Sequence, residues 1–294
     1  MADLFTTTAP TLAPPTSVLP PPATTPPPLS PSILSAFEQL NKWQHVPNAP
    51  PRFTFKHNLQ RASSTRFPSV LDIARKTYGL SDHEAAAVFE WTTGDYRLVN
   101  PIARGGSNKK QDSYVEFQDY PFLPQQTTKV TCRLERDEVM PYVHVLQSAL
   151  LRLPATSAVD TVPFYRGHRR PITSTRPGTT LVLPGFTSVS RDREQALSFA
   201  EKVNEGRSAQ RSLLVFLESR RARSLASLSV RRDEAEYLFP LDTTCVIVEP
   251  PEDRREQDQH AAREATERLR KEMDNDDAEI QVVYLKEVVT GDWA

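Results

Sequence analysis

Hydrophobic residues in the first half of the chain recur every three to four positions, which is the spacing of one face of a helix. Segments with this spacing lie at residues 32–43, 69–79, 81–94 and 137–154. Ser32 stands where the N-cap of the first segment is expected, and Gly79 ends the second. Ser81 and Glu84 have the spacing of a capping box at the start of the third. The pattern predicts a mainly helical N-terminal half.

After Pro154 the pattern changes to short runs of Val, Ile, Leu, Phe and Tyr, which are typical of β-strands. These runs are bounded by Gly, Pro, Asp and Ser and lie at residues 162–167, 179–190, 212–219, 235–249 and 280–288. One helical pattern at residues 190–203 interrupts them, with Asp192 close to its start. Helices followed by strands predict an α+β fold rather than alternating βαβ units.

A strongly charged segment at residues 251–277 precedes the last of these runs. Its hydrophobic residues form a single narrow stripe at i, i+4 spacing, made of Ala261, Ala265, Leu269 and Met273. Acidic residues lead and basic residues follow, which is the order that the helix dipole favours. We expect this segment to be a surface helix inserted before the last strand.

The first 31 residues differ in composition from the rest, since ten of them are proline and most others are Thr, Ser, Ala or Leu. Proline removes backbone donors and favours the extended polyproline conformation, so this segment cannot build a core. We interpret residues 1–31 as a disordered Pro/Thr-rich tail, with a docking tail or a secretion leader as alternatives. A helix and loop at residues 32–57 then lead into one folded domain at residues 58–294.

The overall composition argues against several classes of protein. The net charge of −1 over 294 residues gives no case for nucleic-acid binding. A basic cluster is interpreted as a solvated surface, and its members are Arg220, Arg221, Arg223, Arg231 and Arg232. Two distant cysteines, Cys132 and Cys245, are too few for a disulfide framework and favour a reducing compartment. With no apolar run long enough to span a bilayer and no signal peptide, we expect a cytoplasmic protein, or an effector secreted without a classical signal.

Glu234 and Glu236 are the first candidate catalytic residues. On a strand, residues at this spacing point to the same face, about 6.6 Å apart. Paired carboxylates can share the work of glycosyl transfer, because one stabilises an oxocarbenium-like cation while the other handles a proton on the nucleophile. Such pairs also occur on exposed strand edges, which is the alternative interpretation.

Arg166, Gly167 and Ser188 add to this candidate site. An arginine at the end of a strand suits a bidentate grip on phosphate, and the glycine beside it lets a ligand approach the backbone. Ser188 and Ser190 lie in a turn between a strand and a helix, where a hydroxyl can orient a carboxylate. Taken singly, the arginine would more often form a structural salt bridge and the serines would more often cap the helix.

In their order along the chain, these motifs resemble those of the R-S-E class of mono-ADP-ribosyltransferases, which includes arginine-modifying bacterial toxins and vertebrate ecto-enzymes. The resemblance rests on FYRG at residues 164–167, GFTSVS at 185–190 and EAEYLFP at 234–240. Weaker similarity at residues 80–105 and 146–154 extends it over the chain from about residue 58 to the end, apart from the charged insertion. The sequence departs from the family's usual Ser-Thr-Ser motif at Val189, which replaces the threonine.

The resemblance implies a helical N-terminal lobe packed on a two-sheet β-sandwich core, with NAD+ bound as the substrate in a cleft between them and no metal. Arg166 would contact NAD+ near its phosphates and ribose, and the backbone of Gly167 would hold the nicotinamide carboxamide. Ser188 would hydrogen-bond Glu236, which stabilises the oxocarbenium ion. Glu234 would position and deprotonate the guanidinium of an arginine on a target protein.

Asn100 and Arg104 are expected to help bind the phosphates or the adenine end of NAD+. No GxGxxG, GxxxxGK[ST], HExxH or CxxC motif is present, which argues against NAD+ as a hydride carrier in a Rossmann fold. The activity that the resemblance implies is transfer of ADP-ribose from NAD+ to arginine side chains of target proteins, with release of nicotinamide. An NAD+ glycohydrolase on the same scaffold and a catalytically weak interaction module are the alternatives.

Overall fold

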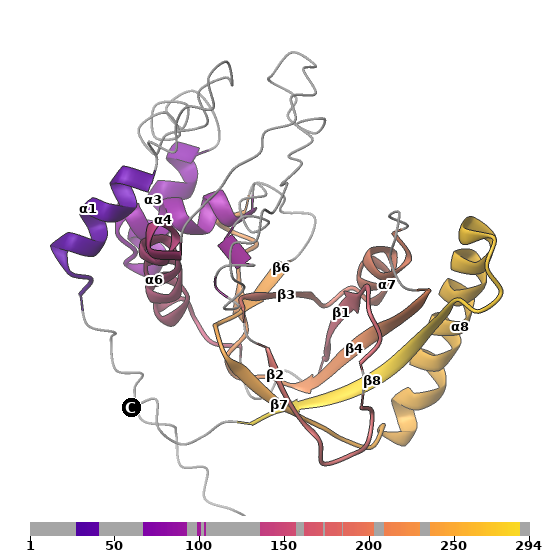
Figure 1. Ribbon diagram of the computed structural model, residues 1–294. Helices are drawn as coiled ribbons and strands as arrows, with labels where there is room; N and C mark the ends of the chain where they lie inside the picture. The colour runs from indigo at the N-terminus through magenta and orange to yellow at the C-terminus, as the bar shows by residue number, and fades with distance from the viewer. Residues whose placement is uncertain are drawn as a thin grey trace, which may run out of the picture.

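The computed structural model describes residues 28–40, 67–92, 99–100, 103, 136–156, 162–172, 174–183, 185–202, 209–229 and 236–288. Helices of the first half form a lobe, and strands of the second half form a strongly curled sheet beside it (Figure 1). In the part of the chain that the structure describes, no helix is long and apolar enough to cross a membrane. Residues 1–27 of the predicted tail lie outside the described residues.

The helical lobe contains α1 (Pro31–Leu40), α3 (Phe67–Tyr78), α4 (Asp82–Glu90) and α6 (Arg136–Arg152). Helix α6 packs against α1 and α4, and α3 packs against α4. Their apolar faces meet in a buried core that includes Phe37, Ala74, Val88, Leu146 and Leu150. Leu225 and Leu238 from the second half of the chain belong to the same core, so the lobe is anchored on one end of the sheet.

Two helix ends in this lobe follow directly from the local sequence. The Ser81 hydroxyl accepts a hydrogen bond from the Glu84 amide at 3.3 Å, and the Glu84 carboxylate accepts one from the Ser81 amide at 2.9 Å. The predicted capping box is therefore confirmed. Gly79 has a φ of +64°, the left-handed conformation in which glycine commonly ends a helix.

The predicted N-cap of the first helix is wrong by two residues. Helix α1 begins at Pro31, which has a fixed φ that suits the first helical position. Ser30 therefore precedes the helix, and its hydroxyl accepts a hydrogen bond from the Ile33 amide at 3.3 Å. Ser32 lies inside the first turn.

The second half of the chain forms an eight-stranded sheet with strand order β2-β7-β8-β4-β1-β3-β6-β5. Its strands are β1 (Phe164–His168), β2 (Thr180–Leu183), β3 (Thr187–Ser190), β4 (Gln210–Glu218), β5 (Arg223–Ser224), β6 (Glu236–Phe239), β7 (Thr243–Ile247) and β8 (Glu279–Glu287). Strands β4 and β8 are parallel, and the other neighbouring pairs in this sheet are antiparallel. The mixture of a helical lobe and a mainly antiparallel sheet agrees with the predicted α+β class.

Hydrogen bonding joins these eight strands into one sheet, whereas the sequence predicted two packed sheets. The joint between β1 and β3 is narrow, because only Tyr165 and Ser190 pair across it. On one side of the joint, β4 pairs with β1 over five residues, and on the other, β6 pairs with β3 over four. The sheet therefore bends at this joint, and β3 and β6 run in a different direction from β1 and β4 (Figure 1).

Two of the predicted strand runs each contain two strands. Residues 179–190 form β2 and β3, and residues 235–249 form β6 and β7. Asp242 lies between β6 and β7 with a φ of +54°, which Asp tolerates better than most residues. Strand β2 pairs with β7, while β3 pairs with β6. Both runs thus cross from one arm of the bent sheet to the other.

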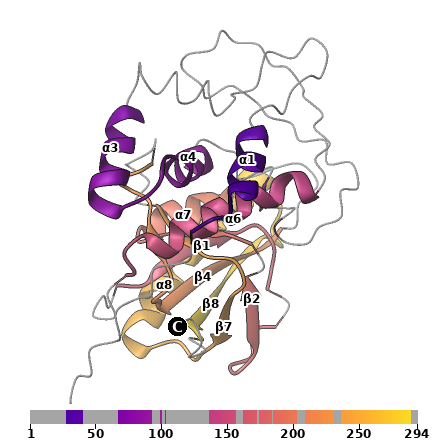
Figure 2. The same ribbon diagram turned by 90° about the vertical axis from the view of Figure 1, so that its left-hand side faces the viewer.

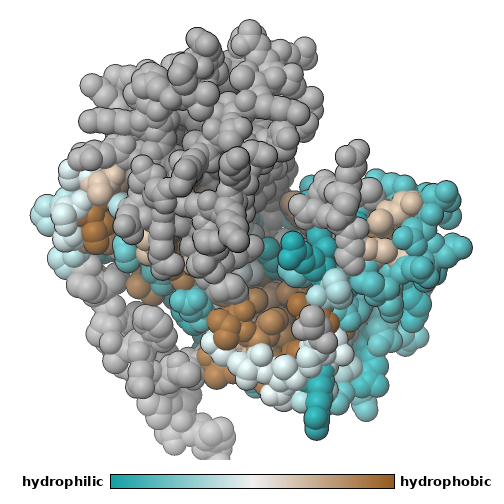
Figure 3. Space-filling view, in the orientation of Figure 1, coloured by the Kyte–Doolittle hydropathy of each residue, from teal (hydrophilic) through white to brown (hydrophobic). Residues whose placement is uncertain are grey.

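Helices α7 (Arg193–Glu201) and α8 (Glu252–Met273) cover one face of β1, β4 and β8 (Figures 1 and 2). The predicted helix within residues 251–277 is present as α8, and Ala261, Ala265 and Leu269 of its stripe are buried. The outer surface on this side is hydrophilic, whereas hydrophobic side chains gather in the hollow of the curled sheet (Figure 3).

Candidate active site

Strands β1, β3 and β6 meet at the bend in the sheet, and each carries one of the predicted catalytic residues. Arg166 lies in β1, Ser188 lies in β3, and Glu236 is the first residue of β6. Ser190 pairs with Tyr165 of β1 on one side and with Glu236 of β6 on the other. The backbone pairing therefore gathers residues that are far apart in the sequence.

The side chain of Arg166 is held against the strand of Ser188. Its Nη1 donates a hydrogen bond of 2.6 Å to the carbonyl oxygen of Ser188. Bonds from a charged guanidinium are shorter and stronger than those between neutral groups. The structure thus brings the predicted arginine and serine into direct contact across the weakly paired joint between β1 and β3.

Ser188, Ser190 and Glu236 lie on one face of the β3–β6 pair. Ser190 is directly opposite Glu236, and Ser188 is two residues along the same strand. Diagonal neighbours of this kind are roughly 7–8 Å apart, within reach of a long side chain such as glutamate. The carbonyl oxygen of Ser188 accepts the hydrogen bond from Arg166. The predicted bond from the Ser188 hydroxyl to Glu236 stays a prediction.

The alternative interpretation, in which a serine caps the helix, does not hold for Ser190, because the N-cap of α7 is Asp192 and Ser190 holds the turn before it. Its hydroxyl accepts a hydrogen bond from the Asp192 amide at 3.0 Å and donates one to Gln195 Oε1 at 2.9 Å. The Asp192 carboxylate then caps α7 by accepting from the amides of Glu194 and Gln195. The predicted helix start near Asp192 is confirmed. The Ser190 hydroxyl thus stabilises the turn between β3 and α7.

Gly167 is needed for the packing of β1 against α7. A Cβ atom at this position would lie 2.0 Å from the carbonyl oxygen of Ala196 and 2.6 Å from the amide nitrogen of Ala200. Both atoms belong to the helix backbone, so a side chain at this position would push α7 away. This is a structural reason for the glycine, and its predicted backbone contact with nicotinamide stays a prediction.

Asn100 connects the helical lobe to Phe186, the residue directly before the strand of Ser188. Its Nδ2 donates a hydrogen bond of 2.7 Å to the carbonyl oxygen of Phe186, and the residue is buried. The ring of Trp91 contacts the Phe186 ring edge-on, with centroids 5.3 Å apart. Asn100 therefore has a structural bond, and its predicted role in NAD+ binding stays a prediction. Glu234 and Arg104 lie outside the described residues.

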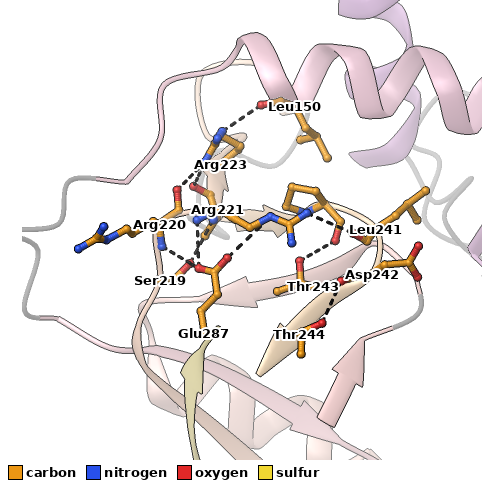
Figure 4. Close-up of polar contacts among 12 residues, drawn as sticks. Leu150, Ser219, Arg220, Arg221, Arg223, Leu241, Asp242, Thr243, Thr244 and Glu287 are labelled. Atoms are coloured by element: carbon orange, nitrogen blue, oxygen red, sulfur yellow. Dashed lines mark hydrogen bonds and ion pairs between the residues drawn. The ribbon is translucent and has the colours of Figure 1, made fainter. Parts of the chain in front are cut away.

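The segment that leads into β5 is held by a buried carboxylate that sequence reasoning missed, Glu287 at the end of β8 (Figure 4). Glu287 Oε2 accepts hydrogen bonds from the Ser219 hydroxyl at 3.1 Å and from the amides of Arg220 and Arg221 at 2.7 and 3.1 Å. The contact arises because β8 lies parallel to β4, which brings Glu287 next to the end of β4. The local sequence around Glu287 gives no sign of this distant partner.

The arginines of the same segment are structural as well. Arg223 Nε donates to the carbonyl oxygen of Leu150 in the last turn of α6 at 3.0 Å, and burial lowers the pKa of Arg223 to about 10. Arg221 Nη2 donates to the carbonyl oxygen of Leu241 at 3.4 Å. The prediction of a solvated basic surface is therefore wrong for Arg221 and Arg223, because they fill carbonyl-lined sites between the sheet and the lobe.

The arrangement suits an anionic, hydroxyl-bearing ligand. A guanidinium on β1 can bind a phosphate, and a carboxylate on β6 can accept a hydrogen bond from a ribose hydroxyl or stabilise a cation. Among the described residues, no three His, Cys, Asp or Glu side chains lie close enough together to hold a metal ion.

We compared the sequence and the fold with those of known proteins. No protein-family model and no curated protein matches the sequence. The ADP-ribosyltransferase HopU1 of Pseudomonas syringae superposes with a TM-score of 0.50 and 15% identity, over 88% of this chain and 98% of that chain. Vis toxin, an ADP-ribosyltransferase from Vibrio splendidus, superposes with a TM-score of 0.46 and 18% identity, over 92% of this chain and 91% of that chain. Exoenzyme S from Pseudomonas aeruginosa, in a complex with human 14-3-3 protein beta and carba-NAD, superposes with a TM-score of 0.45 and 14% identity. This superposition covers 78% of this chain and 87% of that chain. By its likeness to HopU1, this chain has the fold of an ADP-ribosyltransferase.

Proposed function

We propose that this protein is a mono-ADP-ribosyltransferase that transfers ADP-ribose from NAD+ to arginine side chains of target proteins. The observation that carries the proposal is the meeting of β1, β3 and β6, which brings Arg166, Ser188 and Glu236 to one bend of the sheet. The fold shared with HopU1 supports it. The order of the three residues along the chain is also that of the R-S-E motifs.

In the first step of the proposed reaction, the bond between C1′ of the nicotinamide ribose and the pyridine nitrogen breaks, and its electron pair leaves on nicotinamide. Arg166 binds a phosphate of NAD+. Glu236 accepts a hydrogen bond from the ribose 2′-hydroxyl and stabilises the positive charge that develops on the ribose. Removing one preorganised group of this kind typically lowers kcat by about 10²–10³-fold.

In the second step, a guanidinium nitrogen of the acceptor attacks C1′ and loses a proton to Glu234. A carboxylate suits this acceptor, because a guanidinium is planar and cationic and binds carboxylates in a bidentate manner. Water attacking C1′ instead would give hydrolysis of NAD+, which depends on the first step and needs no grip on a guanidinium. The two glutamates are therefore expected to affect the two activities differently.

The test compares Glu236→Gln with Glu234→Gln, using agmatine as the guanidinium acceptor. Glu236→Gln should lower both nicotinamide release and agmatine labelling by about 10²-fold or more, because the charge that faces the oxocarbenium ion is lost. Glu234→Gln should abolish labelling and leave much of the nicotinamide release. Glu272→Gln, on an exposed turn of α8, serves as the matched control and should leave both activities unchanged.

Each other outcome has a definite meaning. Normal labelling by Glu236→Gln would reject the proposed function. Equal loss of both activities in both variants would reject the assigned division of roles. Nicotinamide release without labelling of agmatine or of proteins in a cell lysate by the unmodified protein would identify an NAD+ glycohydrolase. The absence of both activities would identify a non-catalytic module.

A further inference from the structure

Arg191, the residue directly after β3, lies against two aromatic rings. Its Cζ is 5.1 Å from the centroid of the Phe164 ring and 5.2 Å from that of the Tyr237 ring. The two rings contact each other, with centroids 4.7 Å apart and an interplanar angle of 59°. A guanidinium within about 6 Å of a ring centroid is attracted by the ring, and more strongly when water is excluded. Arg191 is half-buried and Phe164 is buried.

Two residues of this cluster lie in strands of the candidate site, and Arg191 directly follows the third strand. Phe164 lies in β1, two residues before Arg166. Tyr237 lies in β6, directly after Glu236. Arg191 follows Ser190, whose backbone is paired with both of the other strands. A single cation–aromatic cluster therefore connects β1, which carries Arg166, to β6, which carries Glu236.

The cluster lies where the backbone supports the site least. Strands β1 and β3 share only the Tyr165–Ser190 pair, so few ladder hydrogen bonds oppose a shift of one strand along the other. Side chains alternate along a strand, so Tyr237 points to the face of β6 opposite to Glu236. Arg191 therefore contacts β6 on the face opposite to Glu236, and it contacts β1 through Phe164, on the face that carries Arg166. A side chain that touches both strands in this way can hold their relative position.

We propose that Arg191 is a positioning residue, whose guanidinium between Phe164 and Tyr237 fixes the strand of Glu236 relative to that of Arg166. This inference rests on the proposed function, since it assigns Arg191 to the same reaction. A displacement of about 1 Å at a reacting group can lower a rate by about 10²-fold even when the substrate contacts remain. Loss of the cluster is therefore expected to lower kcat much more than it changes KM for NAD+.

The test compares Arg191→Met with Arg191→Lys in nicotinamide release. Arg191→Met keeps the length of the side chain but removes the cation, and kcat should fall by about 10-fold or more with KM for NAD+ changed less than about 3-fold. Arg191→Lys restores a cation over the rings and should recover most of the lost kcat. Arg268→Gln, which breaks the ion pair of 2.6 Å with Glu201 between α8 and α7, removes an arginine far from the cluster and should leave kcat unchanged.

A second pair of variants covers the case in which Arg191→Met does not fold. Tyr237→Phe keeps the ring and should retain kcat, whereas Tyr237→Leu removes the ring and should lower kcat in the same way as Arg191→Met. Amide hydrogen exchange gives a readout that does not need activity. Exchange at Tyr165 and Ser190 should accelerate in Arg191→Met, while exchange in α8 stays unchanged.

The results separate this inference from the proposed function. If the unmodified protein releases no nicotinamide, the proposed function fails, and exchange at Tyr165 and Ser190 still decides whether Arg191 holds the joint. Unchanged kcat and unchanged exchange in Arg191→Met would overturn the inference. Equal changes in kcat, KM and exchange across the whole domain, without recovery in Arg191→Lys, would also overturn it, because they would show a general role in folding.

Discussion

At the scale of single residues, Gly167 shows how a backbone contact can decide the identity of a residue inside a functional motif. Its missing side chain lets α7 approach β1 to a distance at which a Cβ would lie 2.0 Å from a carbonyl oxygen. A motif that the sequence suggests for ligand contact thus has a packing role that is independent of any ligand.

Gly167→Ala should lower the free energy of unfolding by about 3 kcal/mol, at the upper end of the range for overpacking, because the clashing atoms belong to a helix backbone. Urea unfolding followed by circular dichroism measures the loss. Gly79→Asn is the matched control, since nothing lies within 4 Å of a Cβ there and the left-handed φ of +64° is tolerated by Asn. Its cost should stay below about 1 kcal/mol, and equal costs for the two variants would contradict the packing argument.

At the scale of elements, the charged helix α8 docks on the sheet through a buried carboxylate. Asp258 accepts a hydrogen bond from Arg193 Nη1 of α7 at 3.2 Å and another from the Tyr284 hydroxyl of β8 at 3.2 Å. Burial, followed by the negative charge of Asp258, raises the pKa of Tyr284. Tyr284 lies in one row with Val215 and Tyr165, the residue before Arg166, so α8 supports the strand that carries the candidate arginine.

Asp258→Ala should therefore destabilise the protein more than the loss of an exposed ion pair between the same two helices. The Asp258 side chain is 2% exposed and Arg193 is 30% exposed, so we expect a loss of roughly 2–3 kcal/mol, below the 3–5 kcal/mol typical of fully buried pairs. Arg268→Gln breaks the pair with Glu201, in which the arginine is 52% exposed, and should cost less than about 1 kcal/mol. Thermal unfolding of the two variants compares them, and a smaller effect of Asp258→Ala would reject the docking role.

At the scale of the whole molecule, the inner face of the curled sheet forms a separate core, in which Cys245 of β7 is fully buried. Burial raises the pKa of the Cys245 thiol to about 12, from an ordinary value of about 9. Above pH 9 the unfolded chain loses this proton while the folded protein keeps it. The contribution of the thiol to stability is therefore complete below pH 9 and is lost as the pH rises from about 9 to about 12.

This linkage predicts an alkaline loss of stability that Cys245→Val removes. Each pH unit above 9 should cost the unmodified protein about 1.4 kcal/mol from this group. The measurement is the difference in the free energy of unfolding between the two proteins at pH 8 and at pH 10, so that other titrating groups cancel. A difference that does not change with pH would show that the thiol can ionise in the folded state.

The sequence by itself determined the features that depend on neighbours along the chain. The capping box at Ser81, the helix end at Gly79 and the start of α7 near Asp192 could be predicted because each depends on residues only a few positions apart. The same holds for the α+β class, because hydrophobic period reports which face of an element is buried. Arg166, Ser188 and Glu236 could be selected as candidates because their motifs occur in the order of the R-S-E family.

Only the tertiary structure decided which distant residues meet. The bend at the Tyr165–Ser190 pair, the bond from Arg166 to Ser188 and the cluster around Arg191 all depend on strand order and register. Glu287 likewise binds the segment around Arg221 because β8 lies parallel to β4. Strand order and register are set by the packing of the whole chain, since a strand presents the same pattern of alternating side chains to every potential neighbour.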